Sequence, residues 1–503
     1  MKLNFKPLFG LCAFAAVAAV ILAVSHFTSW GSDSHPAFAV SGTPVNRDAR
    51  AGTSYAPIVK RVAPSIVNIY STRFIKERPL RNPLMNDPFF RQFFGDRFQG
   101  DDRERTRKEQ SLGSGVIVSP DGYILTANHV VEDADEVKIS IAENKKEYTA
   151  KVIGKDKATD IAVLKIQAAN LPAVTLADSD QLEVGDVVLA LGNPFGVGQT
   201  VTMGIVSGLG RSGLGFNGYE NFIQTDAGIN PGNSGGALVD VEGRLVGINT
   251  AIISRSGGNQ GIGFAVPINM ARNVLERLVS GGKIARGYLG IIPQDIDADL
   301  AKQFGLTDQT GALVGDVMAD APAAKAGLKS GDVIVALNGK PVTDAHGLQL
   351  AISQINPGTS VAVKIIRNGF SKIINVTLAE LPGSETAASE SGSSDAGPGM
   401  ADALDGVTVA DLEPPVREQL RVPSQIHGVL VTAVDGDSNS ASAGLQANDL
   451  IVEINRQPVA SADAAVRLCK AARGEHILVK IWRRNGNFAG TRYLSVDNTK
   501  RAK

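Results

Sequence analysis

Cysteine is nearly absent from this chain. Its two cysteines are Cys12 and Cys469, and Cys12 lies in an apolar segment near the N-terminus. If export removes that segment, Cys469 has no partner, which excludes an intrachain disulfide. The helical pattern around Cys469 favours a small buried side chain over a nucleophile. Because neither a cysteine pair nor an H-E-x-x-H pattern occurs, nothing supports a metal site.

Net charge is also nearly absent, with 50 Lys and Arg against 51 Asp and Glu. No long basic stripe interrupts this balance, so the composition argues against a nucleic-acid partner. No Walker sequence occurs, which argues against ATP-driven unfolding. A G-x-G-x-x-G spacing at Gly208, Gly210 and Gly213 lacks the following helix and the βαβ unit of a dinucleotide site. We therefore expect no cofactor.

The N-terminus carries the pattern of a secretory signal. Lys2 and Lys6 precede an apolar run from Leu8 to Val24, and the small-residue site Ala37-Phe38-Ala39 follows. We expect residues 1–39 to be a signal peptide that directs export from a bacterial cytoplasm. An uncleaved membrane anchor stays open as the alternative, because the polar gap is long and the apolar run is near the lower limit for spanning a bilayer.

The length of 503 residues suggests about three domains. From about Tyr55 to Ile268, short apolar strands are punctuated by glycine, a pattern typical of a β-barrel or sandwich. A helical segment that stops at Gly281-Gly282 closes this first region.

The remainder contains a duplicated module, with "APAAKAGLKSGDVIVALNGKPV" in one copy and "SNSASAGLQANDLIVEINRQPV" in the other. A fixed internal interval indicates a repeated domain. The segment 383–399 between the copies is poor in apolar residues and rich in Gly and Ser, which predicts a flexible linker. The same interval separates Gly327 from Gly444 and Asp332 from Asp449.

A segment from about 74 to 110 combines phenylalanines at helical spacing with a mixed-charge run. One interpretation is a short amphipathic helix that covers its own barrel. The other is a long aromatic loop that contacts another subunit, which we favour because so many phenylalanines are hard to bury beside a polar tail. The phenylalanines are Phe89, Phe90, Phe93, Phe94 and Phe98.

One serine lies in a cluster of small residues, "GNSGG" from Gly232 to Gly236. Glycine is costly in regular structure, so such a cluster indicates unusual backbone angles or a close approach of another backbone. It is either a tight surface turn or a turn that presents Ser234 as a nucleophile beside N–H groups directed at an oxyanion.

A nucleophilic serine needs a histidine as base, oriented by a carboxylate. His129 is the only histidine in the strand-rich region outside the predicted leader, and it follows the apolar strand "YILTA". Asp160 precedes the apolar strand "IAVLKI". Each of these residues alone is weak support for a catalytic site, since histidine and aspartate are both common in turns and cores. Together, the order His, Asp, Ser on a β domain is that of chymotrypsin-type proteases.

The stretches "LTANHVV", "TDIAVLKI" and "TDAGINPGNSGGAL", followed by "GYLGI" and "AGLKSGDVIVALNG", resemble the HtrA family of periplasmic serine endoproteases, in the type with two PDZ domains. The resemblance covers nearly all the chain after the leader. It implies a mainly β fold, with a chymotrypsin-like double β-barrel followed by two PDZ-like domains. The implied domains are a protease domain at 40–282, a first PDZ domain at 283–382, the linker at 383–399 and a second PDZ domain at 400–498.

The resemblance implies a role for each matched residue of the first domain. Ser234 attacks the scissile carbonyl, His129 transfers the proton and Asp160 fixes the imidazole tautomer. The N–H groups of Gly232 and Ser234 form the oxyanion hole, and Asn233 between them shapes the turn.

Further matches concern substrate and regulation. Ile229 and Ile252 match positions that line a pocket for small aliphatic residues such as valine, and Arg211 matches a sensor-loop arginine that relays peptide binding, with a plain surface arginine as the alternative. The strand from Ile248 to Ile252, which includes Asn249, Thr250 and Ala251, is implied to pair with the substrate backbone.

In the first module, the loop of Tyr288, Leu289, Gly290 and Ile291 matches the PDZ loop that captures a peptide C-terminus. The corresponding segment of the second module, Leu404 to Val407, is a poorer match. The implied partners are unfolded proteins, C-terminal peptides and further copies of the chain in trimers or multiples of trimers. A peptide-binding scaffold or chaperone, in which proteolysis is minor, is the second hypothesis.

Overall fold

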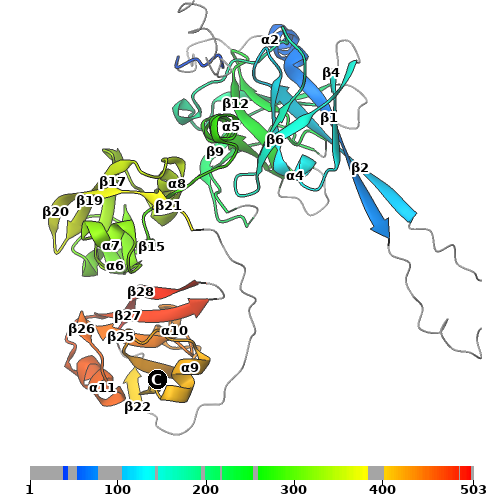
Figure 1. The fold of residues 1–503 in the computed structure, drawn as a ribbon. Coiled ribbons are helices and arrows are strands. Elements are labelled where there is room, and N and C mark those ends of the chain that lie inside the picture. Colours follow the sequence, from blue (N-terminus) through cyan, green and yellow to red (C-terminus); the bar gives the residue numbers. More distant parts are fainter. Residues whose placement is uncertain are drawn as a thin grey trace, which may run out of the picture. The chain divides into compact units, whose positions relative to one another are not determined.

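A computed structural model describes residues 38–43, 54–77, 105–141, 146–193, 199–215, 218–230, 232–252, 259–382, 401–485 and 488–499. The chain divides into two compact units, Met1–Ile284 and Ala285–Lys503 (Figure 1). Residues 1–37 of the predicted leader, the five phenylalanines of the aromatic segment and the predicted linker lie outside the described residues. Within the described ranges, no helix has the length and apolarity needed to cross a membrane.

The first unit begins with a helix and a seven-stranded sheet in the order β5-β4-β1-β2-β3-β7-β6. In β4, alternate side chains face the core, since Val137, Ile139 and Ile141 are buried and their neighbours are partly exposed. This period of two is the mark of a strand with one face on a core. The elements are α2 (Ala56–Val62), β1 (Ile66–Glu77), β2 (Arg105–Ile117), β3 (Tyr123–Ala127), α4 (Asn128–Val131), β4 (Glu136–Ile141), β5 (Lys146–Thr149), β6 (Lys151–Asp156) and β7 (Ile161–Lys165).

Six further strands close on themselves as a barrel in the order β10-β13-β12-β11-β8-β9. Its core includes Val188, Ile223, Leu238 and Val246, each at most 1% exposed. The mainly β fold predicted from the sequence is therefore confirmed. The strands are β8 (Val187–Gly192), β9 (Thr200–Arg211), β10 (Phe222–Thr225), β11 (Ala237–Asp240), β12 (Leu245–Ile252) and β13 (Gly263–Pro267).

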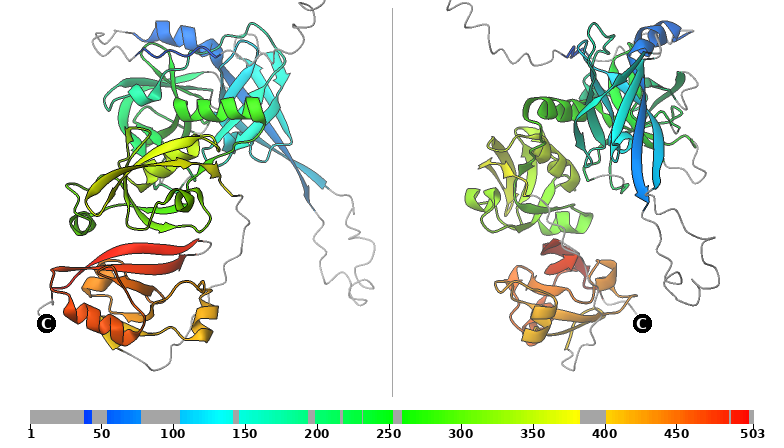
Figure 2. Two further views of the ribbon diagram at one scale, coloured as in Figure 1. Left: turned by 60° about the vertical axis from the view of Figure 1, so that its left-hand side comes forward. Right: turned by 45° about the vertical axis from the view of Figure 1, so that its right-hand side comes forward.

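Helix α5 (Ile268–Gly281) follows the barrel and ends where the sequence predicted a stop. Gly282 adopts φ +69°, the left-handed conformation that glycine permits at a helix end. The helix buries one face, including Val274 and Leu278, against strands of both sheets (Figure 2). Gly154 in β6 allows this contact, since a methyl group there would lie 2.4 Å from Leu278.

Strands β1 and β2 continue beyond the sheet as a two-stranded ribbon, which Figure 2 shows projecting from the unit. Their antiparallel register runs from Ile66 opposite Val116 to Glu77 opposite Arg105. The ends of the segment predicted as a loop at about 74 to 110 therefore form strand. The part between them, where the two interpretations of the phenylalanines differ, lies outside the described residues.

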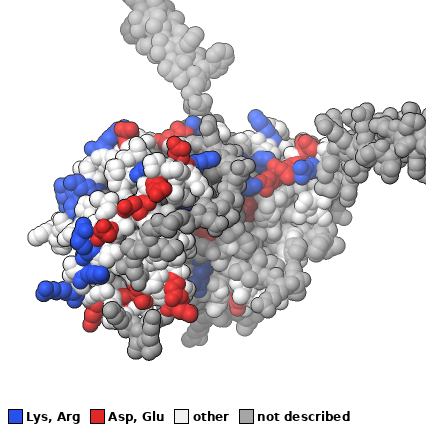
Figure 3. Space-filling model, turned by 90° about the horizontal axis from the view of Figure 1, so that it is seen from below, with Lys and Arg blue, Asp and Glu red and all other residues white. Residues whose placement is uncertain are grey.

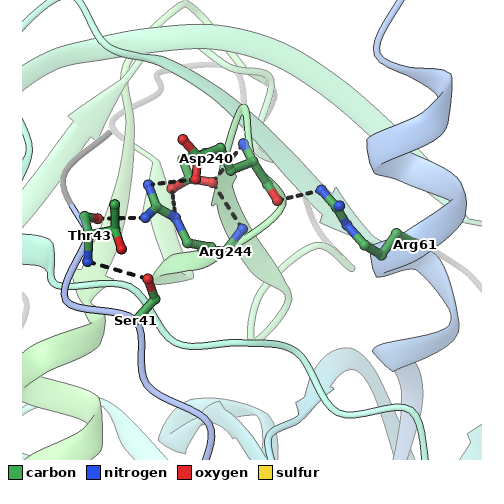
Figure 4. A network of polar contacts seen from close by, with 6 residues as sticks. Ser41, Thr43, Arg61, Asp240 and Arg244 are labelled. Carbon is green, nitrogen blue, oxygen red and sulfur yellow. Dashed lines mark hydrogen bonds and ion pairs between the residues drawn. The ribbon is translucent and has the colours of Figure 1, made fainter. Parts of the chain in front are cut away.

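The segment Phe38–Thr43 lies on the first unit. The carbonyl of Ala39 accepts a hydrogen bond from Leu176 N–H at 3.0 Å, and Ser41 N–H donates to the Leu176 carbonyl at 3.0 Å. Arg244 donates from one guanidinium nitrogen to the Thr43 carbonyl at 2.5 Å and from Nε to Asp240 at 2.7 Å (Figure 4). Because the Arg244 and Asp240 side chains are only 7% and 1% exposed, a buried ion pair fixes this segment.

The second unit repeats one sheet topology twice. The first copy has the strand order β15-β16-β17-β19-β20 and the second has β23-β24-β25-β27-β28, with β22 added at one edge. The first copy consists of β14 (Gly287–Tyr288), β15 (Ile291–Gln294), α6 (Ala298–Gln303), β16 (Ala312–Val317), α7 (Pro322–Ala326), β17 (Val333–Leu337), β18 (Lys340–Pro341), α8 (Ala345–Gln354), β19 (Ser360–Arg367), β20 (Phe370–Thr377) and β21 (Ala379–Glu380). The second consists of β22 (Ala401–Leu404), β23 (Val407–Asp411), α9 (Pro414–Gln419), β24 (Val429–Val434), α10 (Asn439–Ser442), β25 (Leu450–Ile454), β26 (Gln457–Pro458), α11 (Ala462–Ala471), β27 (His476–Asn485) and β28 (Phe488–Asp497).

Each copy is fixed by the same buried ion pair. Arg367 pairs with Asp332 at 2.6 Å, and Arg483 pairs with Asp449 at 2.5 Å, while both aspartates are 1% exposed. A bidentate guanidinium–carboxylate contact compensates the burial of an aspartate. The duplicated aspartates of the sequence are thus structural.

Charge on the face drawn in Figure 3 is mixed, with Lys and Arg interspersed among Asp and Glu. This agrees with the formal net charge of −1.

Candidate active site

Strand pairing brings His129 and Asp160 together. Strands β3 and β7 are antiparallel neighbours, and Ala127 at the end of β3 lies opposite Ile161 at the start of β7. His129 follows β3 in the short helix α4, and Asp160 immediately precedes β7. Asn128 N–H donates to the Asp160 carbonyl at 2.9 Å, which connects the two segments directly.

The Asp160 carboxylate contacts His129 twice. One oxygen accepts from the backbone N–H of His129 at 2.9 Å, and the other lies 2.8 Å from the ring Nδ1. The Asp160 side chain is 7% exposed and that of His129 is 45% exposed. Because Asp160 holds Nδ1–H, the tautomer that leaves Nε2 as a proton acceptor is favoured.

Thr250 is a third contact of Asp160 that the sequence did not reveal. Its hydroxyl donates to the same carboxylate oxygen as the imidazole. The register of β12 against β13 shifts between Asn249 and Ala251, so Thr250 is the extra residue of a β-bulge. A bulge redirects a side chain out of the regular alternation. The prediction that this strand pairs with the substrate backbone concerns the Thr250 main chain; its buried side chain contacts Asp160.

Ser234 contacts the backbone carbonyl of Thr250, whereas Asp160 contacts the Thr250 hydroxyl. Its Oγ is 3.4 Å from the Thr250 carbonyl, and among the described residues no hydrogen bond joins Ser234 to His129. Catalytic hydrogen bonds are often long or poorly aligned until substrate binds. The structure thus brings His129 and Asp160 into contact and connects Ser234 to both through Thr250. A cavity of about 210 Å³ is lined by His129 together with Ser71, Thr72 and Glu132, and the Ser234 turn does not line it.

Two glycines of the cluster have backbone angles that require glycine. Gly232 has φ +99° and Gly235 has φ +81°, angles that other residues rarely adopt. A methyl group at Gly235 would also lie 2.2 Å from Thr126 Oγ1 and 2.3 Å from the Ser114 carbonyl. The cluster is therefore a tight turn pressed against the first sheet, which is the close approach that the sequence indicated.

Among the described residues, two N–H groups of the turn have no acceptor. Those of Gly232 and Ser234 take part in none of the hydrogen bonds found among the described residues, whereas Asn233 N–H donates to the Asn230 carbonyl at 2.9 Å. Gly236 N–H donates to the Asn233 carbonyl, also at 2.9 Å. Free N–H groups on either side of a fixed residue are suited to an oxyanion.

The remaining residues matched to substrate binding occupy different places. Asn249 is fully buried beneath the turn, where its carbonyl accepts from Gly235 N–H at 2.7 Å and its amide donates to the Ala237 carbonyl at 3.0 Å. It therefore supports the nucleophile turn, not a pairing edge. Ile229 is 1% exposed in the barrel core. Ala251 and Ile252 belong to β12, and their side chains are outside the described part.

Arg211 ends strand β9, and its Nε donates to the side chain of Gln224 at 2.9 Å. The neighbouring Gly208 leaves space for the guanidinium, since a methyl group there would lie 2.7 Å from Nε. Arg211 thus lies against β10 and contacts none of the three catalytic candidates among the described residues.

In the second unit, the loop from Tyr288 to Ile291 presents free N–H groups. The carbonyls of Leu289 and Gly290 accept from Ala323 and Met318, both at 2.9 Å. The N–H groups of Leu289 and Gly290 have no acceptor among the backbone bonds of the described residues. This leaves donors for a carboxylate at the end of β15.

The matching loop of the second copy differs in charge. Asp405 replaces the apolar residue at the position of Leu289, and its carboxylate accepts from Asn439 N–H at 2.9 Å. The loop thus already contains a carboxylate of its own, which would repel that of a peptide.

Within the described part of the chain, no group of three or more His, Cys, Asp or Glu side chains could hold a metal ion.

Known families match both units. A trypsin-like peptidase domain model matches residues 113–248, and PDZ domain models match residues 287–378 and 430–483. Among solved structures, "HtrA-type protease AlgW with decapeptide" is similar at 45% identity and a TM-score of 0.52, over 66% of this chain and 100% of that one.

Curated relatives extend over most of the chain. The "Periplasmic pH-dependent serine endoprotease DegQ" of Escherichia coli is 42% identical over 434 residues, which are 86% of this chain and 90% of the relative. The "Periplasmic serine endoprotease DegP" of Salmonella typhimurium is 41% identical over 81% of this chain and 85% of its own. The chain therefore belongs to the DegP and DegQ family of HtrA-type serine endoproteases, with a trypsin-like peptidase domain and two PDZ domains.

Proposed function

We propose that Ser234, His129 and Asp160 carry the peptide hydrolysis of this endoprotease by acyl transfer. The observation that supports this most is the double contact of Asp160 with the backbone N–H and Nδ1 of His129, which leaves Nε2 as the base. Ser234 Oγ lies 3.4 Å from the Thr250 carbonyl, and it must leave that acceptor before it donates to Nε2.

In the first step, Ser234 Oγ attacks the scissile carbonyl while Nε2 of His129 takes its proton. The tetrahedral intermediate collapses as His129 returns that proton to the leaving amine, and an acyl-enzyme remains. A water molecule then attacks the ester with His129 again as base, which releases the carboxylate product and restores Ser234. Asp160 stays ionised and stabilises the imidazolium in both steps.

The free N–H groups of Gly232 and Ser234 would bind the negative oxygen of each tetrahedral intermediate. Loss of one such donor costs about 2.7–4 kcal/mol in the barrier of other proteases. We assign Ile229 and Ile252 to the pocket for a small aliphatic residue at the cleavage site, and the outer part of β12 to substrate pairing.

The substrates that we propose are unfolded or damaged exported proteins, cleaved without ATP. Export would use the signal at residues 1–39, with an uncleaved inner-membrane anchor as the alternative. Curated relatives are named as periplasmic enzymes, which supports this location for the present chain. We propose assembly into trimers or their multiples on the basis of the family likeness, and sedimentation of the purified chain would measure it.

We further propose 40–282 as the protease domain, 283–382 and 400–498 as the PDZ domains, and Arg211 as the residue that relays peptide binding.

Peptide capture would use the loop of the first PDZ domain only, because the Asp405 carboxylate in the second loop would repel a peptide carboxylate. The residues of the first loop are Tyr288, Leu289, Gly290 and Ile291. A peptide with a free C-terminus should then bind at one site per chain by calorimetry. Its C-terminally amidated form should not bind.

The catalytic assignment is tested with Ser234→Ala. The variant should lose both casein cleavage without ATP and labelling by a fluorophosphonate, while Ser280→Ala, an exposed serine in α5, should retain both. If Ser234→Ala is still labelled, the assignment of Ser234 as the nucleophile is refuted. If wild type and variant are both inert yet suppress aggregation of an unfolding client, also with activating peptides added, the chaperone function takes precedence.

A further inference from the structure

Ser114 is a fully buried serine that the triad assignment does not use. It lies in β2 between two glycines, and its exposed fraction is 0%. Strand β2 belongs to the seven-stranded sheet, whereas the Ser234 turn joins the closed barrel. Ser114 therefore connects the two halves of the protease domain at the candidate nucleophile.

Its contacts converge on the turn. Ser114 Oγ donates to the Gly232 carbonyl at 2.6 Å, and its backbone N–H donates to the Ser234 carbonyl at 2.9 Å. The same Oγ accepts from Asn193 N–H at 2.8 Å. Because an N–H group can only donate, the hydroxyl proton of Ser114 must point to Gly232.

These contacts fix the two peptide planes that flank the Asn233–Ser234 peptide. The plane between Gly232 and Asn233 is held at its carbonyl by Ser114 and at its N–H by Asn230. The plane after Ser234 is held at its carbonyl by Ser114 and at its N–H by Asn249. Ser114 is therefore the one residue that holds both planes on either side of the Asn233–Ser234 peptide within the described contacts.

Gly232 needs such a restraint more than other residues would. At φ +99° it occupies a region where glycine has several accessible conformations of similar energy. Rotation of its carbonyl would alter the path of the turn and the direction of its N–H group. A donor aimed at an oxyanion must be held in place before the charge develops.

We propose that Ser114 is a positioning residue for the oxyanion-binding turn, with its hydroxyl holding Gly232 so that the N–H groups of Gly232 and Ser234 face one point. This inference rests on the proposed role of Ser234 and goes beyond it. Ser114 does not itself contact the substrate. It acts by holding the backbone of Gly232 and Ser234, whose N–H groups would bind the oxyanion.

The test compares Ser114→Ala with Ser119→Ala. Ser119 is also a fully buried serine, and its Oγ accepts from Tyr123 N–H at 3.1 Å, away from the turn. For Ser114→Ala, kcat on a peptide substrate should fall about 10- to 100-fold with KM changed less than threefold, as expected for a misplaced catalytic group. Ser119→Ala should lower thermal stability and leave kcat unchanged.

A transition-state readout separates positioning from simple packing. A peptide boronate that forms a tetrahedral adduct with serine should bind Ser114→Ala more weakly, by the same factor as the loss in kcat/KM. Lower melting temperature with unchanged boronate affinity and kcat would overturn the inference. If Ser114→Ala does not fold, Ser114→Cys replaces it, because its thiol is a weaker donor of similar size. Its kcat and boronate affinity should fall by less than the factor expected for Ser114→Ala. Wild-type values of both would overturn the inference.

Ser234→Ala distinguishes the two levels of the proposal. If that variant still cleaves and labels, the proposed catalytic assignment fails, and Ser114 loses its role with it. If Ser234→Ala is inactive while Ser114→Ala is indistinguishable from wild type in kcat and boronate affinity, only the inference on Ser114 fails.

Discussion

Thr250 joins the acid and the proposed nucleophile. Its hydroxyl donates to the Asp160 carboxylate, and its carbonyl accepts from Ser234 Oγ at 3.4 Å. Both contacts come from one bulged residue in β12, and its hydroxyl shares an Asp160 oxygen with Nδ1 of His129. The bulge therefore brings the Thr250 hydroxyl to the carboxylate oxygen that contacts Nδ1 of His129.

Thr250→Val tests this support, because it removes the hydroxyl at nearly constant shape. A hydrogen bond to a charged group contributes about 1.5–3 kcal/mol, so kcat should fall about 10- to 150-fold if the contact is as strong in the transition state. Steady-state kinetics on a chromogenic peptide measure the effect. Thr250→Ser, which keeps the hydroxyl, should remain near wild type, and an unchanged kcat for Thr250→Val would refute the role.

The sequence predicted that Asp160 orients His129 from the order His, Asp, Ser and from the resemblance to the HtrA family. It named Thr250 only for substrate binding and did not name Ser114. The role of Thr250 depends on a one-residue shift of register between β12 and β13. That of Ser114 depends on how the first sheet packs on the turn. Both are tertiary effects that leave no periodic signal in a single strand.

The conformation of the turn can be tested with a matched pair of glycines. Gly235→Ala would place a methyl group 2.2 Å from Thr126 Oγ1 at φ +81°, so the turn must shift. Fluorophosphonate labelling should be lost. Gly282→Ala meets nothing within 4 Å at φ +69°; it should cost only about 1–2 kcal/mol of stability for the left-handed backbone and keep its labelling. Equal labelling of both variants would contradict a conformational requirement at Gly235.

Removal of one partner of the buried pair Arg244–Asp240 should destabilise the protease domain. In Asp240→Asn, the 7%-exposed Arg244 side chain loses its buried charged partner and keeps only the more exposed Glu242 at 3.4 Å. Breaking a buried pair costs about 3–5 kcal/mol. Asp133→Asn breaks an exposed pair with Arg73, whose side chains are 51% and 63% exposed, and should cost less than about 1 kcal/mol. Urea unfolding measures both, and similar losses would show that Arg244 does not anchor this region.

Cys469 should be unreactive while the second PDZ domain is folded. It lies in α11, 7% exposed in the domain core, and burial raises the pKa of its thiol to about 12. A free cysteine ionises near pH 8.5, and only the thiolate reacts with iodoacetamide. Alkylation at pH 8.5 should therefore be on the order of 1,000-fold slower in the folded protein than in guanidinium. Equal rates would contradict the burial.

The raised pKa of the Cys469 thiol also predicts how the free energy of unfolding depends on pH. Below about pH 8.5 the thiol is protonated in both states and contributes no pH dependence. Above that pH the unfolded thiol ionises while the folded thiol, with its pKa near 12, stays protonated, so unfolding becomes more favourable until the pH reaches the folded value. From pH 8.5 to 9.5, wild type should thus lose up to about 1.4 kcal/mol more than Cys469→Ala, which has no thiol to ionise. Urea titrations at the two pH values measure the difference, and parallel losses in both proteins would mean that Cys469 ionises equally in the folded and unfolded states.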